Sequence, residues 1–214
     1  DSGRAVYFDP GGTVQWNAVD TGNNSILFNE AHRLLDGQRV LYQADANSGG
    51  QGNQSVGGLV SGESYYVIVV SEFEIQLSRT SDTGWNRDLF TNYVSIADGA
   101  VELTSGATGS TESLHRFVVQ NTDVEEDWIV SENHELWTGQ AFTYELKTGP
   151  AIGGLVEGQT YYAVRLDANR FRVADSLENA SLAAGGGEGW VDLLSVGESN
   201  TNQAVRYETF VYPF

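Results

Sequence analysis

The sequence contains no cysteine and no methionine, and only three of its 214 residues are proline. The missing cysteines exclude a disulfide framework, and they leave the redox compartment open. Because no methionine stands at position 1, we expect a processed mature protein or a piece of a longer one. No run of about 18 apolar residues occurs, so the sequence predicts no membrane-spanning helix and no membrane insertion.

Basic residues are also scarce. Lys and Arg total 11 against 29 Asp and Glu, which gives a net charge of -18 at pH 7. Nucleic acids and anionic membrane surfaces are polyanions that repel such a chain, so neither is expected as a partner. The excess of carboxylates favours solubility and leaves oxygen ligands available for divalent cations.

The residues that are present favour strands and turns. The chain holds 25 glycines, and its short apolar stretches are rich in Val and Tyr. Stretches of this kind, separated by Gly, Asn and Asp, are typical of many short β-strands joined by turns. Only residues 175–180, with a Ser or Asp cap, predict a turn of helix.

One stretch of the sequence occurs twice. Residues 56–80 return without a gap as residues 152–176, and both copies contain Gly-Gly-Leu followed by Tyr-Tyr. Matches continue on both sides, for example His32 with His134. The duplication and the chain length predict two homologous domains of ordinary size, residues 1–118 and residues 119–214.

Each copy predicts a β-hairpin with one apolar face. In the second copy Arg165 stands between apolar neighbours, so we expect Tyr162 and Val164 to point into the core. The same alternation in both copies predicts a set of buried side chains: Tyr66, Ile68, Val70, Ile75 and Leu77, with Tyr162, Val164, Leu166, Phe171 and Val173. With about six short strands per copy, the predicted fold class is all-β: two tandem homologous small β-sandwich or partly open β-barrel domains.

The repeated pattern resembles a known type of repeat. In the second copy it consists of His134, Leu136, Gly139-Gln140, Tyr144, Ile152-Gly153-Gly154-Leu155, Tyr161-Tyr162, Asp167-Ala168-Asn169 and Asp192-Leu193. Over residues 26–118 and 128–207 it resembles tandem repeats of very large secreted bacterial surface proteins, of the adhesin and filamentous haemagglutinin-like type. Related modules occur in phage tail fibres. The resemblance implies an extracellular, cell-surface location and a role as spacer or filament material. The first copy departs from it at residues 71–73, where the Asp-x-Asn turn is absent.

Catalytic motifs are weak. His134-Glu135 begins like a zinc-protease motif, but the second His is missing, and His32-Arg33 stands at the matching place. No nucleophile elbow and no phosphate loop occur, and spacing singles out no pair of carboxylates. We therefore predict that the protein is not an enzyme and that His134 is a structural residue near a turn.

The five tryptophans are candidates for a sugar-binding surface. Trp128 and Trp137 align with Ile26 and Leu35 of the first copy, so we expect these two rings in the core or in a contact between repeats. Trp85 and Trp190 lie in predicted loops and are the candidate ligand-binding residues.

Two further hypotheses concern a metal and the termini. Asp123, Glu125, Glu126 and Asp127 could bind calcium, since carboxylate oxygens suit this ion, although no calcium-loop consensus is present. Both ends of the chain are apolar, and strand addition between copies would use them. The candidate self-association residues are Val6, Tyr7, Phe8, Phe210, Val211, Tyr212 and Phe214. Pairing of each end within its own chain is the alternative.

The sequence thus predicts an extracellular structural protein. It would be a repeat subunit of a bacterial surface filament or giant adhesin, with copies of itself or neighbouring repeats as partners, and it could polymerise head-to-tail through terminal strands. No cofactor is expected apart from the calcium considered above. The alternative is a carbohydrate- or receptor-binding module, including a segment of a phage tail fibre.

Overall fold

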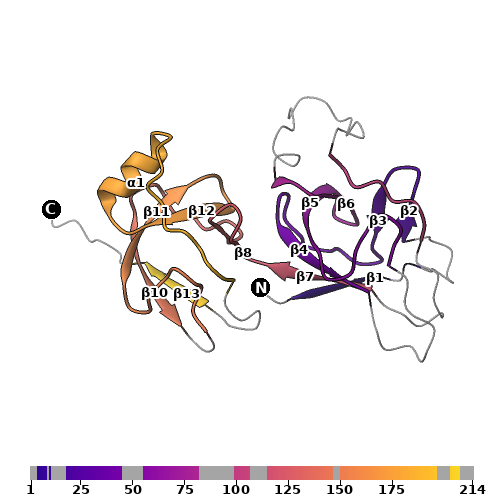
Figure 1. Ribbon diagram of the computed structural model, residues 1–214, viewed down its shortest axis with the longest axis horizontal. Helices are drawn as coiled ribbons and strands as arrows, with labels where there is room; N and C mark the ends of the chain where they lie inside the picture. The colour runs from indigo at the N-terminus through magenta and orange to yellow at the C-terminus, as the bar shows by residue number, and fades with distance from the viewer. Residues whose placement is uncertain are drawn as a thin grey trace. The chain divides into compact units, whose positions relative to one another are not determined.

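The regular secondary structure of the described residues is antiparallel β-sheet apart from one short helix (Figure 1), which confirms the all-β prediction. The computed structural model describes residues 4–8, 10, 18–44, 55–81, 99–106, 115–146 and 150–196, together with the backbone of residues 203–207. It contains two compact units, Arg4–Val119 and Gln120–Phe214. Within the described residues, no helix is long and apolar enough to cross a membrane.

The first unit contains one sheet. Its strands are β1 Ala5–Phe8, β2 Val19–Asp20, β3 Ser25–Leu27, β4 Arg39–Gln43, β5 Ser64–Ser71, β6 Glu74–Ser78 and β7 His115–Gln120. They lie in the order β1-β7-β4-β5-β6-β3-β2. The strands at the two ends of this order are not paired with each other among the described residues, so the sheet is open.

The second unit repeats this sheet and adds one helix. Its elements are β8 Thr122–Asp123, β9 Trp128–Val130, β10 Ala141–Leu146, β11 Thr160–Arg165, β12 Arg170–Ala174, α1 Leu177–Ala184 and β13 Gln203–Tyr207. The strand order β13-β10-β11-β12-β9-β8 is that of the first unit without β1. The helix lies against β11 and β12 (Figure 1).

The strand registers show that the duplication is structural. Tyr66 pairs with Ser78 in the first hairpin, and Tyr162 pairs with Ala174 at the matching positions of the second. The hairpin strands of the two units therefore pair in the same register, with each pair offset by 96 residues. The alignment of Trp128 with the first unit changes. Asp123 pairs with Trp128 in the short hairpin of the second unit, and the matching Asp20 also pairs with a residue across the short hairpin of the first unit. That partner is Ser25, so Trp128 takes the place of Ser25 rather than of Ile26.

Each unit has its own apolar core on one face of its sheet. The core of the first unit includes Tyr65, Val67, Ile75 and Leu77, all at most 2% exposed. The core of the second unit holds the matching residues, which are Tyr161, Ala163, Phe171 and Val173. The predicted burial of the second strand of each hairpin is therefore confirmed.

Tyr66, Ile68 and Val164 are buried, as predicted. The side on which the first strand of each hairpin meets the main core was predicted wrongly. Its main core side is the one with Tyr65 and Tyr161, not the one with Tyr66 and Tyr162. The opposite face is also covered: Val164 and the half-buried Tyr162 pack against α1 and Ala174. Leu166 is 38% exposed and Val70 is half-buried, so neither belongs to the fully buried core. Arg165 misled the prediction because it lies at the end of β11, where its side chain is exposed.

The helix confirms the predicted start and extends further. Its N-cap is Ser176, whose hydroxyl accepts the backbone N–H of Asn179 at 3.2 Å. An N-cap of this kind satisfies one of the four N–H groups left unpaired at the start of a helix. Ala180 is the fully buried residue of α1, and it faces Val164 across the second face of the sheet.

Candidate functional sites and the role of the shared residues

His134 braces its own turn. The buried ring accepts the backbone N–H of Leu136 at Nδ1 (3.0 Å), and its Nε2 lies 3.1 Å from the carbonyl oxygen of Arg170. An acceptor role at Nδ1 and a carbonyl beside Nε2 fix the neutral tautomer with its proton on Nε2. Both ring nitrogens therefore bond to backbone, and residues 134–137 are not helical. The resemblance to a zinc-protease helix ends there.

His32 repeats this arrangement in the first unit. Its Nδ1 accepts the N–H of Leu34 at 2.9 Å, and its Nε2 lies 2.7 Å from the carbonyl oxygen of Ser71. Burial lowers the pKa of His32 below its usual value of 6.5, against the opposing effect of the Ser71 carbonyl. The ring stays neutral, as the acceptor role of Nδ1 requires.

Two tyrosines at matching places bond the start of the glycine loop, the segment that contains Gly57-Gly58 in the first unit and Gly153-Gly154 in the second. The hydroxyl of Tyr42 accepts the N–H of Val56 at 3.0 Å, and that of Tyr144 accepts the N–H of Ile152 at 2.8 Å. Burial raises the pKa of Tyr42 to about 12, and it raises the pKa of Tyr144 as well. In the first unit the Tyr42 hydroxyl also lies 2.6 Å from Nδ1 of His115. These hydroxyls are buried structural groups.

The first tyrosine of each Tyr-Tyr pair has a similar task. The hydroxyl of Tyr65 accepts the N–H of Val60, and that of Tyr161 accepts the N–H of Val156, both at 2.9 Å. Each bond closes the turn that leads into the strand on which the tyrosine lies. The sequence pattern Tyr-Tyr is therefore retained for one buried ring with a backbone partner, and not for an aromatic surface.

The Gly-Gly pair of each unit lies against a segment far from it in sequence, residues 102–105 in the first unit and residues 192–195 in the second. In the second unit the N–H of Gly153 donates to the carbonyl of Ser195 at 3.0 Å. A Cβ on Gly154 would collide with the carbonyl oxygen of Asp192, and the φ of 93° at Gly154 favours glycine. The first unit repeats these contacts against residues 102–105. Glycine is needed here for close backbone approach.

Asn24 and Asp127 also occupy matching places. Both have a positive φ, of 53° and 56°, which Asn and Asp tolerate better than most residues. The Asn24 side chain accepts the N–H of Leu103 at 2.9 Å, and the Asp127 side chain accepts the N–H of Leu193 at 2.7 Å. One of the four predicted calcium ligands therefore ties a turn to a distant segment of its own unit.

The other predicted calcium ligands lie in the same turn. Asp123 is buried and accepts the N–H of Glu125 at 3.0 Å, as Asp20 does in the matching turn of the first unit. Glu125 is exposed and Glu126 is half-buried. No group of three or more acidic or histidine side chains is placed to hold a metal ion in the part of the chain that the structure describes. Calcium binding stays a prediction, without a gathered ligand set to support it.

The tryptophans do not lie as the sequence suggested. Trp137 is 63% exposed, so a core position is wrong for this ring, while a contact with another repeat stays a prediction. Trp190 is half-buried, and the guanidinium of Arg172 lies 4.0 Å from the centre of its ring. Trp85 is outside the described residues. Among the tryptophans that the structure describes, Trp137 is thus the exposed ring available to a ligand.

Trp128 is buried and pairs with a positive charge. The guanidinium of Arg170 lies 4.2 Å from its ring centre, which is a favourable cation–π arrangement. At the matching places of the first unit, Ser25 donates to the carboxylate of Glu74 at 2.6 Å. Both residues of the pair differ between the units, while the contact between the two strands is kept.

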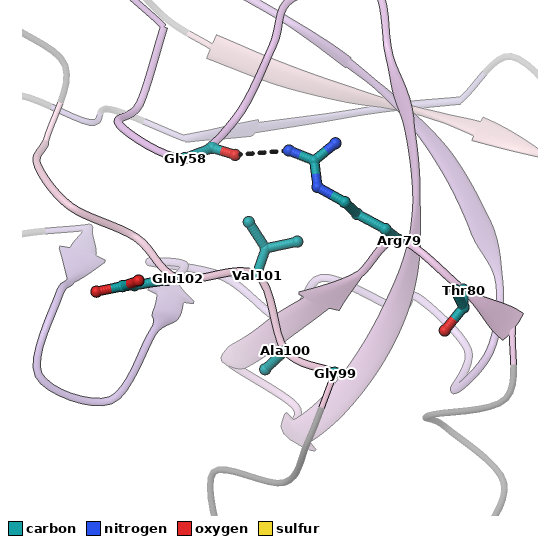
Figure 2. A pocket seen from close by; sticks show the side chains of 7 residues that line it. All are labelled: Gly58, Arg79, Thr80, Gly99, Ala100, Val101 and Glu102. Carbon is teal, nitrogen blue, oxygen red and sulfur yellow. Dashed lines mark hydrogen bonds between the residues drawn. The ribbon is translucent and has the colours of Figure 1, made fainter.

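A pocket of about 410 Å³ lies in the first unit (Figure 2), within the size range of small-molecule sites. It is lined by Gly58, Arg79, Thr80, Gly99, Ala100, Val101 and Glu102. Figure 2 shows Arg79 reaching from the end of β6 to Gly58, while the Glu102 carboxylate points away from Arg79. The pocket combines backbone and small side chains with one cation.

The cation of this pocket is already engaged. Arg79 donates to the carbonyl of Gly58 at 3.1 Å and to the carboxylate of Glu63 at 2.9 Å, and the bond to Glu63 raises the pKa of Arg79. About half of each side chain of this ion pair is exposed, so its contribution to stability is small, about 0–1 kcal/mol. Gln159 and Asp175 stand at the matching places of the second unit. We therefore infer that Arg79 has a structural role: it connects the end of β6 to the glycine loop.

The N-terminal strand belongs to its own unit. β1 pairs with β7, and Val6 and Phe8 are buried, the ring of Phe8 stacked on Phe117 with 5.1 Å between centres. The self-association residues Val6 and Phe8 are therefore corrected to core residues, while Tyr7 is 52% exposed. The other candidates, Phe210, Val211, Tyr212 and Phe214, lie outside the described residues.

The polar side chains described above that are common to both units therefore form hydrogen bonds with backbone groups of their own unit. The structure brings none of the sequence-predicted ligand, metal or catalytic residues together with another into an open site within the part it describes. No family model, no curated protein and no solved structure matches the chain. The internal repeat is the comparison that carries the functional argument.

Proposed function

We propose that the chain is a structural protein, a tandem β-repeat segment of an extracellular bacterial surface filament or giant adhesin. One observation carries the proposal: the side chains common to both units, such as His32 with His134 and Tyr42 with Tyr144, bond backbone of their own unit. A binding or catalytic function kept in both copies would instead bring common polar side chains together at a cavity.

Two further features support this proposal. The net charge of -18 suits a protein surrounded by water along its length, because it favours solubility and opposes non-specific association. The sequence pattern resembles repeats of secreted surface proteins, as described above. Neighbouring repeats and further copies of the chain are the partners that such a function implies, and no catalytic role is proposed.

Labelling of intact cells tests the proposed location. Antibodies raised against the 214-residue chain are expected to label the outside of unpermeabilised cells of the source bacterium, seen by immunogold electron microscopy. The label should follow filaments or cover the surface evenly. Label that appears only after permeabilisation would contradict an extracellular structural role, and label confined to phage tails would move the protein to the tail-fibre alternative.

A glycan-binding module is the second candidate function, and the exposure of Trp137 favours it. Its ring is 63% exposed, and an exposed tryptophan can stack on a sugar ring. If the module binds glycans, retention on immobilised polysaccharides should be lost in Trp137→Ala while thermal stability stays nearly unchanged. Trp190→Ala is the matched comparison, because that ring is half-buried beneath Arg172. An absence of retention by the unmodified protein would remove this candidate.

A further inference from the structure

The two sheets differ in what lies beside their closing strands. β7 and β13 occupy the same place, next to β4 and β10 respectively. The far edge of β7 is covered by β1, whereas no strand covers the far edge of β13 among the described residues. β1 in turn ends its sheet, so its own far edge carries no strand in that part of the chain either. Among the described strands, the first sheet therefore ends at β1 and the second sheet ends at β13, and both edges lie at the end of the strand order that contains the closing strand.

The opposite ends of the two sheets are poor edges for pairing. They are formed by β2 and β8, which are only two residues long. Short edge strands are one way in which proteins prevent sheet-to-sheet association. β1 and β13 have four and five residues, which is enough for a ladder of several hydrogen bonds. Pairing between copies is therefore expected at β1 and β13.

The backbone groups of β1 that face this edge follow from the ladder. The N–H of Val119 donates to the carbonyl of Arg4 at 2.9 Å, and in an antiparallel pair the residues facing the partner alternate. Val6 and Phe8 therefore face β7. Ala5 and Tyr7 turn their N–H and C=O groups towards the open edge.

The same reasoning applies to β13. The N–H of Tyr144 donates to Gln159, so Tyr144 faces β11 and its neighbour Thr143 faces β13. Thr143 is opposite Arg206, so Arg206 faces inward. By alternation, Val205 and Tyr207 turn their backbone N–H and C=O groups towards the open edge. Among the described residues, no strand pairs with these outward-facing groups, which occur at every second residue of both edges.

We infer that β13 of one copy pairs antiparallel with β1 of the next copy, which joins the second sheet of one molecule to the first sheet of another. The pairing of β1 with β7 supplies the precedent, because there a closing strand already accepts an antiparallel strand along this edge. The burial of Val6 and Phe8 keeps β1 in its own unit, so only its far edge is offered. This inference rests on the proposed structural function and names the surfaces through which copies would associate.

The contact would be head-to-tail. It joins two different surfaces, so copies add one after another, into an open chain or, where the rotation between copies closes, into a ring. The net charge of -18 on each copy opposes association. Salt screens this repulsion, because the Debye length falls to about 10 Å at 0.1 M. Assembly is therefore expected to strengthen from low to moderate ionic strength.

Proline substitutions at outward-facing positions test the inference by analytical ultracentrifugation of the full chain. Tyr7→Pro and Val205→Pro each remove one outward N–H, which an edge strand tolerates without losing its inner ladder. At concentrations where the unmodified protein forms chains, each variant alone should sediment as a monomer. An equimolar mixture should form a dimer and nothing larger, because one variant keeps β13 and the other keeps β1.

The controls keep the experiment decisive. Tyr7→Thr retains the backbone N–H and should assemble as the unmodified protein does, and circular dichroism should show that every variant keeps its fold. If Val205→Pro unfolds the second unit, Tyr207→Pro blocks the same edge at the other outward position. An unmodified protein that is monomeric at all concentrations and salt strengths would overturn the inference, and so would Tyr7→Pro that still assembles. Surface labelling is independent of this result, so the inference and the proposed function can fail separately.

Discussion

Gly154→Ala is expected to destabilise the second unit by about 3–5 kcal/mol. A non-glycine residue at a φ of 93° costs on the order of 1–3 kcal/mol. The new methyl group would also meet the carbonyl oxygen of Asp192, and such overpacking costs about 1–3 kcal/mol more. In a domain of this size the melting temperature should fall by roughly 15 °C or more. Differential scanning calorimetry, with one transition followed for each unit, measures the change.

Gly158→Ala is the matched control. Gly158 also has a positive φ, of 78°, but a Cβ there would meet nothing within 4 Å. Its substitution should therefore cost only the conformational strain, on the order of 1 kcal/mol. Equal losses at the two positions would show that close approach to Asp192 is not the reason for the conserved pair in both copies, and the explanation of the repeat would have to change.

Phe171→Ala is expected to cost about 3–5 kcal/mol, the usual range for truncating a buried aromatic residue. Its side chain is 1% exposed. It meets Phe142 edge-on at 5.9 Å and His134 at 5.1 Å between ring centres. Loss of the ring therefore leaves a cavity beside the residue that braces the turn. The second transition in calorimetry should move down, while the transition of the first unit stays in place.

Arg172→Ala tests the facing of the same strand. Arg172 lies on the other face, where it donates to the carbonyl of Glu126 at 3.0 Å and covers the ring of Trp190. One hydrogen bond and one half-exposed cation–π contact together contribute about 1–2 kcal/mol. The substitution should therefore be clearly milder than Phe171→Ala. A larger loss of stability for Arg172→Ala than for Phe171→Ala would show that the main core lies on the face that carries Arg172, contrary to the structure.

Some contacts are common to both units although the residues that form them differ. Gln76 donates to the carbonyl of Asn23 at 2.7 Å, and Arg172 makes the matching bond to Glu126. The residue type changed, but the contact between the second hairpin strand and the first turn was kept. In both units a long side chain of the second hairpin strand therefore donates to a carbonyl of the first turn, and this contact agrees with the proposed structural function.

Sequence patterns failed where a strand is covered on both faces. Alternation predicted Tyr66 and Tyr162 on the main core side, but Tyr65 and Tyr161 lie there. A period of two identifies the inner face only when the other face meets water. In the second unit α1 covers that other face, so apolar residues stand at successive positions, and one exposed Arg165 at the strand end is not a guide.

The sequence by itself determined the duplication, the all-β class and the turns, because these depend on residues close together in the chain. Period-two alternation, glycine at tight turns and the Ser176 cap act locally. Tertiary structure alone decided the tasks of the common polar residues, since their partners are distant: Asn24 bonds Leu103, and Asp127 bonds Leu193. It also decided that Val6 and Phe8 are core residues, because β7 joins β1 from the other end of the same unit. A buried polar group must find a partner wherever the fold brings one, and only the folded sheet brings these segments together.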